Sequence, residues 1–218
     1  MKDIISEKFK ILKESTSFDI PWKFNLFDNL FNDREVESIT QFKNKSYPTK
    51  FVEDTKGNRF RYDFSLGDCA ETDTLFELFS DKSVFDHILP KYTKVDDKVL
   101  LFAIRMYYDV LPFEIPIHTD MNYDKLFTLQ LALDSGVDGT EFYDTEKKYS
   151  LTAPFSVGSG YFFTPTLQTH HAVGLHKPVI KPRLSLMCNY YHAPYENYVS
   201  RDYASWDKNK LVGIPLEF

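Results

Sequence analysis

The stretch EIPIHTDMNYDKLFTLQLALD, residues 114–134, joins two features that decide how the chain folds. Its second half, KLFTLQLAL at 125–133, alternates apolar and polar side chains, the pattern of a β-strand with one face toward a core. Just before this run, His118 and Asp120 stand two residues apart. Alternate residues of an extended segment project to the same face, so this pair can offer an imidazole nitrogen and a carboxylate oxygen to one ion.

Short apolar or alternating runs fill the chain from about residue 98 onward. Gly, Pro, Asn and Asp punctuate them, which is typical of antiparallel strands. Helix signals occur instead at 32–44, where Asn32 can act as an N-cap, and at 71–90. The sequence therefore predicts a mainly β fold, a closed sandwich or jelly roll with N-terminal helices over one face. The runs number six to eight strands and include 98–108, 125–133, 139–144, 153–165, 170–175 and 181–192.

A single domain spanning 1–218 is the expectation at this length. Residues 1–97 would form a helical or mixed support, and 98–193 would form the β core. The remainder, 194–218, is rich in Tyr and Trp, which favours a packed C-terminal flap over a loose end.

Charge and composition exclude several functional classes. The net charge of −6 argues against a nucleic-acid binder, because phosphate-backbone binding needs a surplus of Lys and Arg. Cys69 and Cys188 have neither disulfide nor zinc-site spacing, which fits a reducing, cytoplasmic setting. The longest apolar run, 99–104, is far shorter than the ~18 residues of a membrane span.

A third ligand would turn the His118 and Asp120 pair into a metal site. The pair alone means little, because a chain with 6 His and 32 acidic residues contains about one His-x-acid pair by chance. His170 and His171, in PTLQTHHAVGL at 165–175, are the downstream candidates. Two imidazoles and one carboxylate form the set that suits non-haem Fe(II).

The segment KPRLSL, residues 181–186, adds an anion receptor. Arg183 and Ser185 stand at i and i+2 of a predicted strand and share a face. Burying a guanidinium is costly unless an anion meets it. An Arg beside a hydroxyl is suited to a carboxylate.

The ordered set His118-x-Asp120, GTEF, GYFFTP, HHAV and Arg183-x-Ser185 resembles the Fe(II)- and 2-oxoglutarate-dependent oxygenases, in their compact branch related to prolyl hydroxylases. The resemblance covers roughly residues 99–192. It implies a double-stranded β-helix of the cupin-like jelly-roll type. It also implies that His118, Asp120 and a distal histidine bind Fe(II), that Arg183 and Ser185 bind the far carboxylate of 2-oxoglutarate, and that O2 is consumed.

Two assignments within this resemblance stay open. In the family the distal ligand precedes a small and then an aliphatic residue, which favours His171 in His171-Ala-Val over His170. Family members also place a tyrosine near 2-oxoglutarate on an early core strand, where Tyr107 and Tyr108 are the candidates and an ordinary core tyrosine is the alternative. The carboxylate of Asp120 favours hydroxylation, or a desaturation or cyclisation that shares its first step, over halogenation, because related halogenases have a small residue there.

The substrate is expected to be a small molecule such as an amino acid or related metabolite. Arg59 and Arg61 alternate with aromatic residues as in a strand, so they share a face and are the candidate substrate-binding residues. They belong to the basic segment 43–63, which would be either a mobile loop presenting cations to an acidic or phosphorylated substrate or a solvated run of charge. Thr128 and Gln130 share one face of their strand and would either look into the active site, as substrate-binding residues, or form ordinary strand surface. A peptidyl hydroxylase of the same superfamily and a non-oxygenase, cupin-type metal barrel are the alternative functions.

Overall fold

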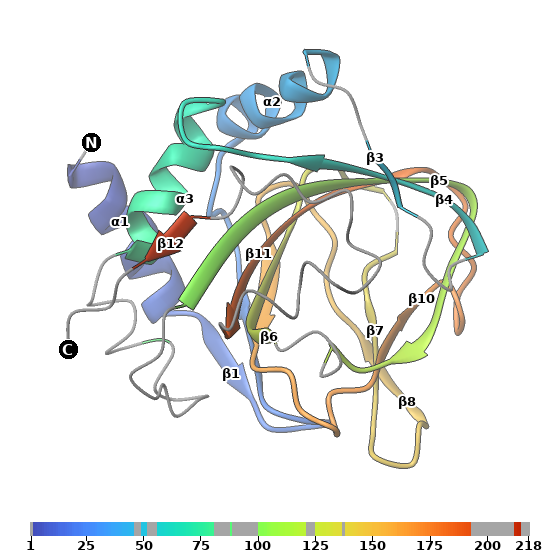
Figure 1. Cartoon of the computed structure of the whole chain (residues 1–218). Helices are drawn as coiled ribbons and strands as arrows, with labels where there is room; N and C mark the ends of the chain where they lie inside the picture. Colours follow the sequence, from blue (N-terminus) through green and yellow to red (C-terminus); the bar gives the residue numbers. More distant parts are fainter. Residues whose placement is uncertain are drawn as a thin grey trace.

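The protein forms a curled antiparallel sheet with three helices packed on one side (Figure 1). The structure is a computed structural model. Its described residues are 2–45, 49–51, 56–80, 88, 100–120, 125–136, 138–192 and 212–214. The predicted mainly β architecture with flanking N-terminal helices is confirmed.

The helices come from the N-terminal part of the chain. Asn32 caps the second helix by accepting hydrogen bonds from the backbone N–H groups of Arg34 and Glu35. The Glu35 carboxylate accepts from the Asn32 backbone N–H in return, which completes a capping box. The helix predicted at 32–44 is thereby confirmed. Of the helix predicted at 71–90, the part up to Ser80 is helical, and the rest lies outside the described residues apart from Ile88, which is in a turn. The helices are α1 (Lys2–Lys13), α2 (Asp33–Gln41) and α3 (Ala70–Ser80), with a short 3-10 helix η1 (Phe42–Asn44) after α2.

Twelve described strands make up the sheet, in the order β1-β2-β9-β6-β11-β5-β10-β7-β8, with β4 and β12 pairing with β5 and β3 pairing with β4. Four of them precede residue 97, so the N-terminal segment supplies strands as well as helices. The bounds are β1 (Thr16–Phe18), β2 (Phe24–Phe27), β3 (Thr49–Phe51), β4 (Lys56–Asp63), β5 (Leu100–His118), β6 (Lys125–Ala132), β7 (Glu141–Tyr143), β8 (Tyr149–Thr152), β9 (Gly160–Phe163), β10 (His171–Val173), β11 (Arg183–His192) and β12 (Val212–Ile214).

Strand β5 links the two parts of the sheet. It is 19 residues long; Leu100–Asp109 pair with β11 on one side, and Arg105–Glu114 pair with β4 on the other. Its last residues pair instead with β10, so that His118 lies opposite His171. One continuous strand thus carries the chain from the helix-covered sheet to the smaller β10-β7-β8 sheet.

The large sheet buries both of its faces, with different side chains. On the helix-covered face, alternate residues of the central strands pack under the three helices in an apolar core that includes Phe79, Phe102, Phe127, Leu186 and Tyr190. The opposite face, called the inner face below, carries aromatic side chains toward β2 and β9, where they meet β7. Elsewhere its buried side chains are mostly polar, charged or phenolic and include Arg59, Arg61, Arg105, Tyr107, Asp109, Thr128, Gln130, Arg183, Ser185, Asn189 and Tyr191.

Glycine is required where the chain enters β9. Gly158 has φ +76°, and a Cβ there would lie 2.1 Å from the Phe31 carbonyl oxygen. A Cβ on Gly160 would lie 2.0 Å from the Gln130 carbonyl oxygen. The GSG turn therefore allows β9 to approach β6 closely.

None of the described helices is long and apolar enough to cross a membrane. Of the predicted flap at 194–218, only β12 is described, and it pairs with Leu100–Phe102 of β5. The remaining flap residues lie outside the described part of the chain.

Candidate active site

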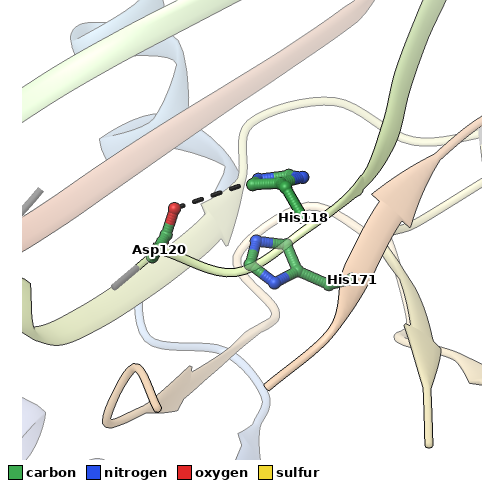
Figure 2. A group of neighbouring side chains, drawn as sticks. All are labelled: His118, Asp120 and His171. Carbon is green, nitrogen blue, oxygen red and sulfur yellow. Dashed lines mark ion pairs between the residues drawn. The ribbon is translucent and has the colours of Figure 1, made fainter. Parts of the chain in front are cut away.

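Three predicted ligands meet where β5 and β10 end. His118 is the last residue of β5, Asp120 follows two residues later, and His171 is the first residue of β10. Because His118 and His171 are directly opposite each other in the antiparallel pair, their side chains lie on the same face, with ring centroids 4.2 Å apart. Their ligand atoms and a carboxylate oxygen of Asp120 all lie within 4.8 Å of one another, and the side chains point toward one another (Figure 2).

Backbone carbonyls fix the orientation of both imidazoles. Nδ1 of His118 lies 2.9 Å from the Pro116 carbonyl oxygen, and Nδ1 of His171 lies 2.9 Å from that of Thr169. A carbonyl oxygen can only accept, so each Nδ1 carries the proton and each Nε2 keeps its lone pair. Metal-binding histidines are typically held in this way.

The two buried ligands are held in the protonation states that a metal needs. Burial and the neighbouring His118 lower the pKa of His171 to about 3, so its ring stays neutral near pH 7. Burial alone would raise the pKa of Asp120, but Lys125, His171 and His118 lower it well below its usual range. Lys125 Nζ lies 3.0 Å from one Asp120 oxygen, and Thr128 Oγ1 donates to the other at 3.3 Å.

This donor set fits Fe(II). Two neutral imidazole nitrogens and one carboxylate on a common face leave the remaining coordination positions of an octahedral ion open. His171, and not His170, belongs to the group. The His170 backbone carbonyl instead accepts a hydrogen bond from the Trp22 indole N–H at 3.3 Å.

The predicted anion receptor is buried on the inner face. Arg183 is 0% exposed and Ser185 is 1% exposed. Among the described residues, neither the three guanidinium nitrogens of Arg183 nor the Ser185 hydroxyl has a hydrogen-bond partner. The Phe155 ring packs against the guanidinium, 4.7 Å from ring centroid to Cζ. Unsatisfied buried donors are costly, and a bound carboxylate would satisfy this set.

Tyr161 links the anion receptor to the triad. It is buried on β9, and its phenol interacts electrostatically with both Arg183 and Asp120. Its hydroxyl donates to the Gln130 side-chain oxygen at 2.5 Å. The triad and the Arg183–Ser185 receptor therefore border the same interior.

The other predicted site residues also lie on the inner face. Tyr107 lies opposite Ser185 in the β5–β11 pair, whereas Tyr108 projects to the other face and packs against the helix-covered core. Gln130 is held by the hydroxyls of Tyr161 and Thr140. Thr128 donates to Asp120, so it contacts a triad residue directly.

Arg59 and Arg61 differ from both sequence-based expectations. They lie in strand β4 and are 9% and 1% exposed, so neither a mobile loop nor a solvated run describes them. Arg59 makes a two-pronged ion pair with the buried Asp109, at 2.6 and 3.0 Å. Arg61 donates through Nε to Asp63 at 3.1 Å. The alternation of these arginines with aromatic residues correctly indicated a strand. Their charges suggested exposure to solvent, but both guanidinium groups are instead paired with acids on the inner face.

Sequence reasoning missed several polar residues of this interior. The buried residues Arg105, Tyr161, Asn189 and Tyr191 and the half-buried Lys125 lie on the inner face or at its edge. A signal existed for Asn189 and Tyr191, because they continue the alternation of Arg183 and Ser185 along β11. Lys125 had no such signal, because it is out of step with Thr128 and Gln130 along β6 and comes opposite Tyr191 only through a register shift in the β6–β11 pair.

Comparisons with known proteins place the fold. No protein-family profile matches the chain, and no curated protein matches its sequence. Among solved structures, a Trichoplax adhaerens prolyl hydroxylase, in complex with a hypoxia-inducible-factor peptide fragment, matches with a TM-score of 0.62 and 11% identity over 87% of this chain and 91% of its own.

Two further structures extend the comparison. A 2OG-Fe(II) oxygenase-family oxidoreductase from Burkholderia pseudomallei matches with a TM-score of 0.53 and 14% identity over 86% of this chain and 89% of its own. A non-heme α-ketoglutarate-dependent epimerase from nogalamycin biosynthesis matches with a TM-score of 0.57 and 13% identity over 100% of this chain and 97% of its own. The fold is that of the 2OG-Fe(II) oxygenases, and the chain carries within it their His-x-Asp…His triad. Fe(II) and 2-oxoglutarate are the typical cofactor and co-substrate of that class.

Proposed function

We propose that the protein is an Fe(II)- and 2-oxoglutarate-dependent dioxygenase that hydroxylates a C–H bond of a small molecule such as an amino acid or related metabolite. One observation carries the proposal. The buried, unsatisfied donors of Arg183 and Ser185 border the same interior as the His118, Asp120 and His171 group, and Tyr161 interacts electrostatically with both Arg183 and Asp120. A metal site alone would not require a second, buried carboxylate receptor.

Each site residue has a defined task in this proposal. His118 and His171 offer Nε2, and Asp120 offers one oxygen, to Fe(II). Arg183 and Ser185 bind the far carboxylate of 2-oxoglutarate, with Tyr107 beside them on β5. When bound, Fe(II) and 2-oxoglutarate would together activate O2 for C–H cleavage, with 2-oxoglutarate supplying two of the four electrons that O2 takes up.

Residues around the triad keep its geometry. Lys125 and Thr128 each bind a different oxygen of Asp120, which restricts rotation of the carboxylate. The Pro116 and Thr169 carbonyls do the same for the two imidazoles. Such supporting contacts typically contribute 10–100-fold to metal affinity or activity.

Two observations support a small substrate. The recognition groups of the inner face are charged or polar and are almost fully buried, which suits a ligand that is enclosed. The epimerase of nogalamycin biosynthesis shares the fold over nearly its whole length. A peptidyl hydroxylase is the second candidate, because a structurally similar prolyl hydroxylase is bound to a peptide fragment.

The decisive assay measures succinate formed from 2-oxoglutarate with Fe(II), O2 and ascorbate. The wild-type protein should form succinate, and Arg183→Met should raise the KM for 2-oxoglutarate at least about tenfold, since charge-assisted hydrogen bonds are worth ~1.5–3 kcal/mol each. Lys148→Met, at a largely exposed position, is the matched control and should change nothing. A folded, metal-loaded protein that forms no succinate under any condition would instead be a cupin-type metal barrel. If succinate is formed, a mass-shift screen against amino acids, nucleosides and peptides would separate hydroxylation of a small molecule from hydroxylation of a peptide.

A further inference from the structure

Two buried arginines lie in one row across the large sheet, with Asp109 between them. In the strand register, Asp109 of β5 lies opposite Arg183 of β11 on one side and opposite Arg59 of β4 on the other. Both Asp109 oxygens accept hydrogen bonds from Arg59, at 2.6 and 3.0 Å. The guanidinium of Arg183 is 0% exposed and makes no hydrogen bond to any described residue. The carboxylate of this row is therefore engaged by Arg59.

The two arginines share an aromatic contact. Arg59 Cζ lies over the Tyr107 ring, 4.6 Å from its centroid, and Arg183 Cζ lies over the Phe155 ring at 4.7 Å. A ring in this position covers a flat face of the guanidinium and leaves the N–H edge to acceptors in its plane. The edge of Arg59 binds Asp109 in a two-pronged ion pair. Arg183 repeats the arginine–aromatic half of this arrangement, and no described side chain supplies the carboxylate half.

The segment that carries Phe155, between β8 and β9, is tied to β6 by backbone hydrogen bonds. The Ala132 carbonyl accepts from the Gly158 N–H at 3.1 Å, and the Ala132 N–H donates to the Ser159 carbonyl at 2.8 Å. Ala132 also lies opposite Ser185 in the β6–β11 pair. The segment is therefore anchored beside the strand that carries the carboxylate receptor.

Close packing against Gly139 fixes the other end of the segment. The Ala153 N–H donates to the Thr140 carbonyl at 2.8 Å, next to Gly139. A Cβ on Gly139 would lie 1.8 Å from the Ala153 carbonyl oxygen and 3.6 Å from the Phe155 Cβ. Gly139, the first residue of the GTEF motif, therefore allows the backbone before Phe155 to approach β7 closely. The place of the aromatic ring is set by backbone contacts on both sides of it.

We propose that Phe155 is a positioning residue of the co-substrate site, whose ring holds the Arg183 guanidinium with its N–H edge toward the far carboxylate of 2-oxoglutarate. This inference rests on the proposed oxygenase function and adds a residue to the Arg183–Ser185 receptor. Phe155 acts through Arg183, because its ring contacts the guanidinium and has no polar atom of its own. A guanidinium that is oriented in advance loses less side-chain freedom when it binds a carboxylate. Phe155 should therefore strengthen binding of 2-oxo acids that have a second carboxylate and have little influence on those that lack one.

The first test compares two ligands that differ only in the far group. The probes are 2-oxoglutarate and 2-oxovalerate, a 2-oxo acid of equal chain length with a methyl group in place of the far carboxylate. Their Kd values are measured by anaerobic calorimetry on the Fe(II)-loaded protein. Phe155→Leu should raise the Kd for 2-oxoglutarate at least about fivefold, through loss of the cation–aromatic contact, and alter the Kd for 2-oxovalerate less than about twofold. Equal weakening of both probes, or unchanged binding of 2-oxoglutarate, would overturn the inference.

The second test uses further variants and the same Kd for 2-oxoglutarate. Phe155→Tyr keeps the aromatic face and should bind within about twofold of the wild type. Phe18→Leu is the matched control, because Phe18 is an exposed residue of the edge strand β1, and it should leave the Kd unchanged. In an Arg183→Met background, Phe155→Leu should cause little further loss, since the two residues act as a unit. A further loss as large as in the wild type, or equal losses in Phe155→Tyr and Phe155→Leu, would contradict the proposal.

Steady-state kinetics and unfolding distinguish positioning from general support of the fold. Phe155→Leu should raise the KM for 2-oxoglutarate but keep kcat at saturating 2-oxoglutarate within about twofold of the wild type. Thermal unfolding of each variant reports its folding. A fall in kcat with an unchanged KM would mean that Phe155 does not serve the carboxylate receptor.

The two proposals fail in different ways. If 2-oxoglutarate binds and is consumed but Phe155→Leu binds it as tightly as the wild type, the oxygenase function stands and the role of Phe155 is wrong. If the metal-loaded wild-type protein neither binds nor consumes 2-oxoglutarate, the proposed function itself is wrong.

Discussion

The two faces of the large sheet are built by the same strands and are both buried, yet one carries mainly apolar side chains and the other mainly polar and charged ones. On β11, Leu184, Leu186, Cys188 and Tyr190 face the helices, whereas Arg183, Ser185, Asn189 and Tyr191 face the interior. The period-two alternation of a strand separates these sets completely. The helix-covered face therefore contributes mainly to stability, and the inner face carries the candidate site residues. Burial alone does not distinguish a hydrophobic core from a functional site.

Among the predicted changes, removal of a triad ligand is expected to have the largest effect on Fe(II) affinity and activity. His118→Ala should lower Fe(II) affinity at least about a hundredfold and abolish succinate formation, because it removes a direct ligand. The His118 side chain is 33% exposed, so the thermal midpoint of the apoprotein should change little. Metal titration and calorimetry would measure the two quantities, and unchanged metal affinity would contradict the assignment of His118.

Truncation of an apolar side chain on the helix-covered face should lower stability and leave Fe(II) affinity nearly unchanged. Phe102 is fully buried against Phe79 and Tyr190, with ring centroids 5.0 and 4.8 Å apart. Phe102→Ala should lower the free energy of unfolding by about 3–5 kcal/mol through the cavity it creates. Urea denaturation would measure this loss. Fe(II) affinity of the folded protein should stay within about threefold, and a larger change would mean that the two faces are not independent.

The Arg59–Asp109 pair tests whether part of the inner face is structural. Asp109→Asn should destabilise the fold by about 3 kcal/mol, because it leaves a buried guanidinium without its charge partner. The double variant Arg59→Met, Asp109→Leu should recover much of this loss. Denaturant unfolding of both variants checks the prediction. If the single variant were as stable as the wild type, a substrate role for Arg59 would become the better account.

A smaller effect is expected from Asp134, beside the Arg183 receptor. Burial raises the pKa of this carboxyl from 3.8 to about 6. The folded state therefore binds more protons than the unfolded state between about pH 4 and 6, and the free energy of unfolding should fall as the pH rises through this range. Asp134→Asn should remove that fall, so that its stability equals the wild type's near pH 4 and exceeds it above pH 6. Unfolding curves from pH 4 to 8 would measure the difference, and parallel curves would contradict it.

Much of the site followed from local sequence. The spacing of His118 and Asp120 and that of Arg183 and Ser185 each depend only on the two-residue period of an extended chain, and the structure keeps both pairs on a common face. The fold class followed from the density of short alternating runs. Arg59 and Arg61 were placed on a shared strand face correctly, but their burial was not foreseen, because the acids that neutralise them are non-local.

The sequence by itself thus determined which side chains share a face of a strand, since that depends on backbone geometry over a few residues. Only the tertiary structure decided which faces meet. The β5–β10 register brings His171 rather than His170 to His118, and the β4–β5–β11–β6 register gathers the polar residues of four strands on the inner face. Register depends on contacts between residues far apart in the chain, and a single slip would turn every side chain of a strand to the other face.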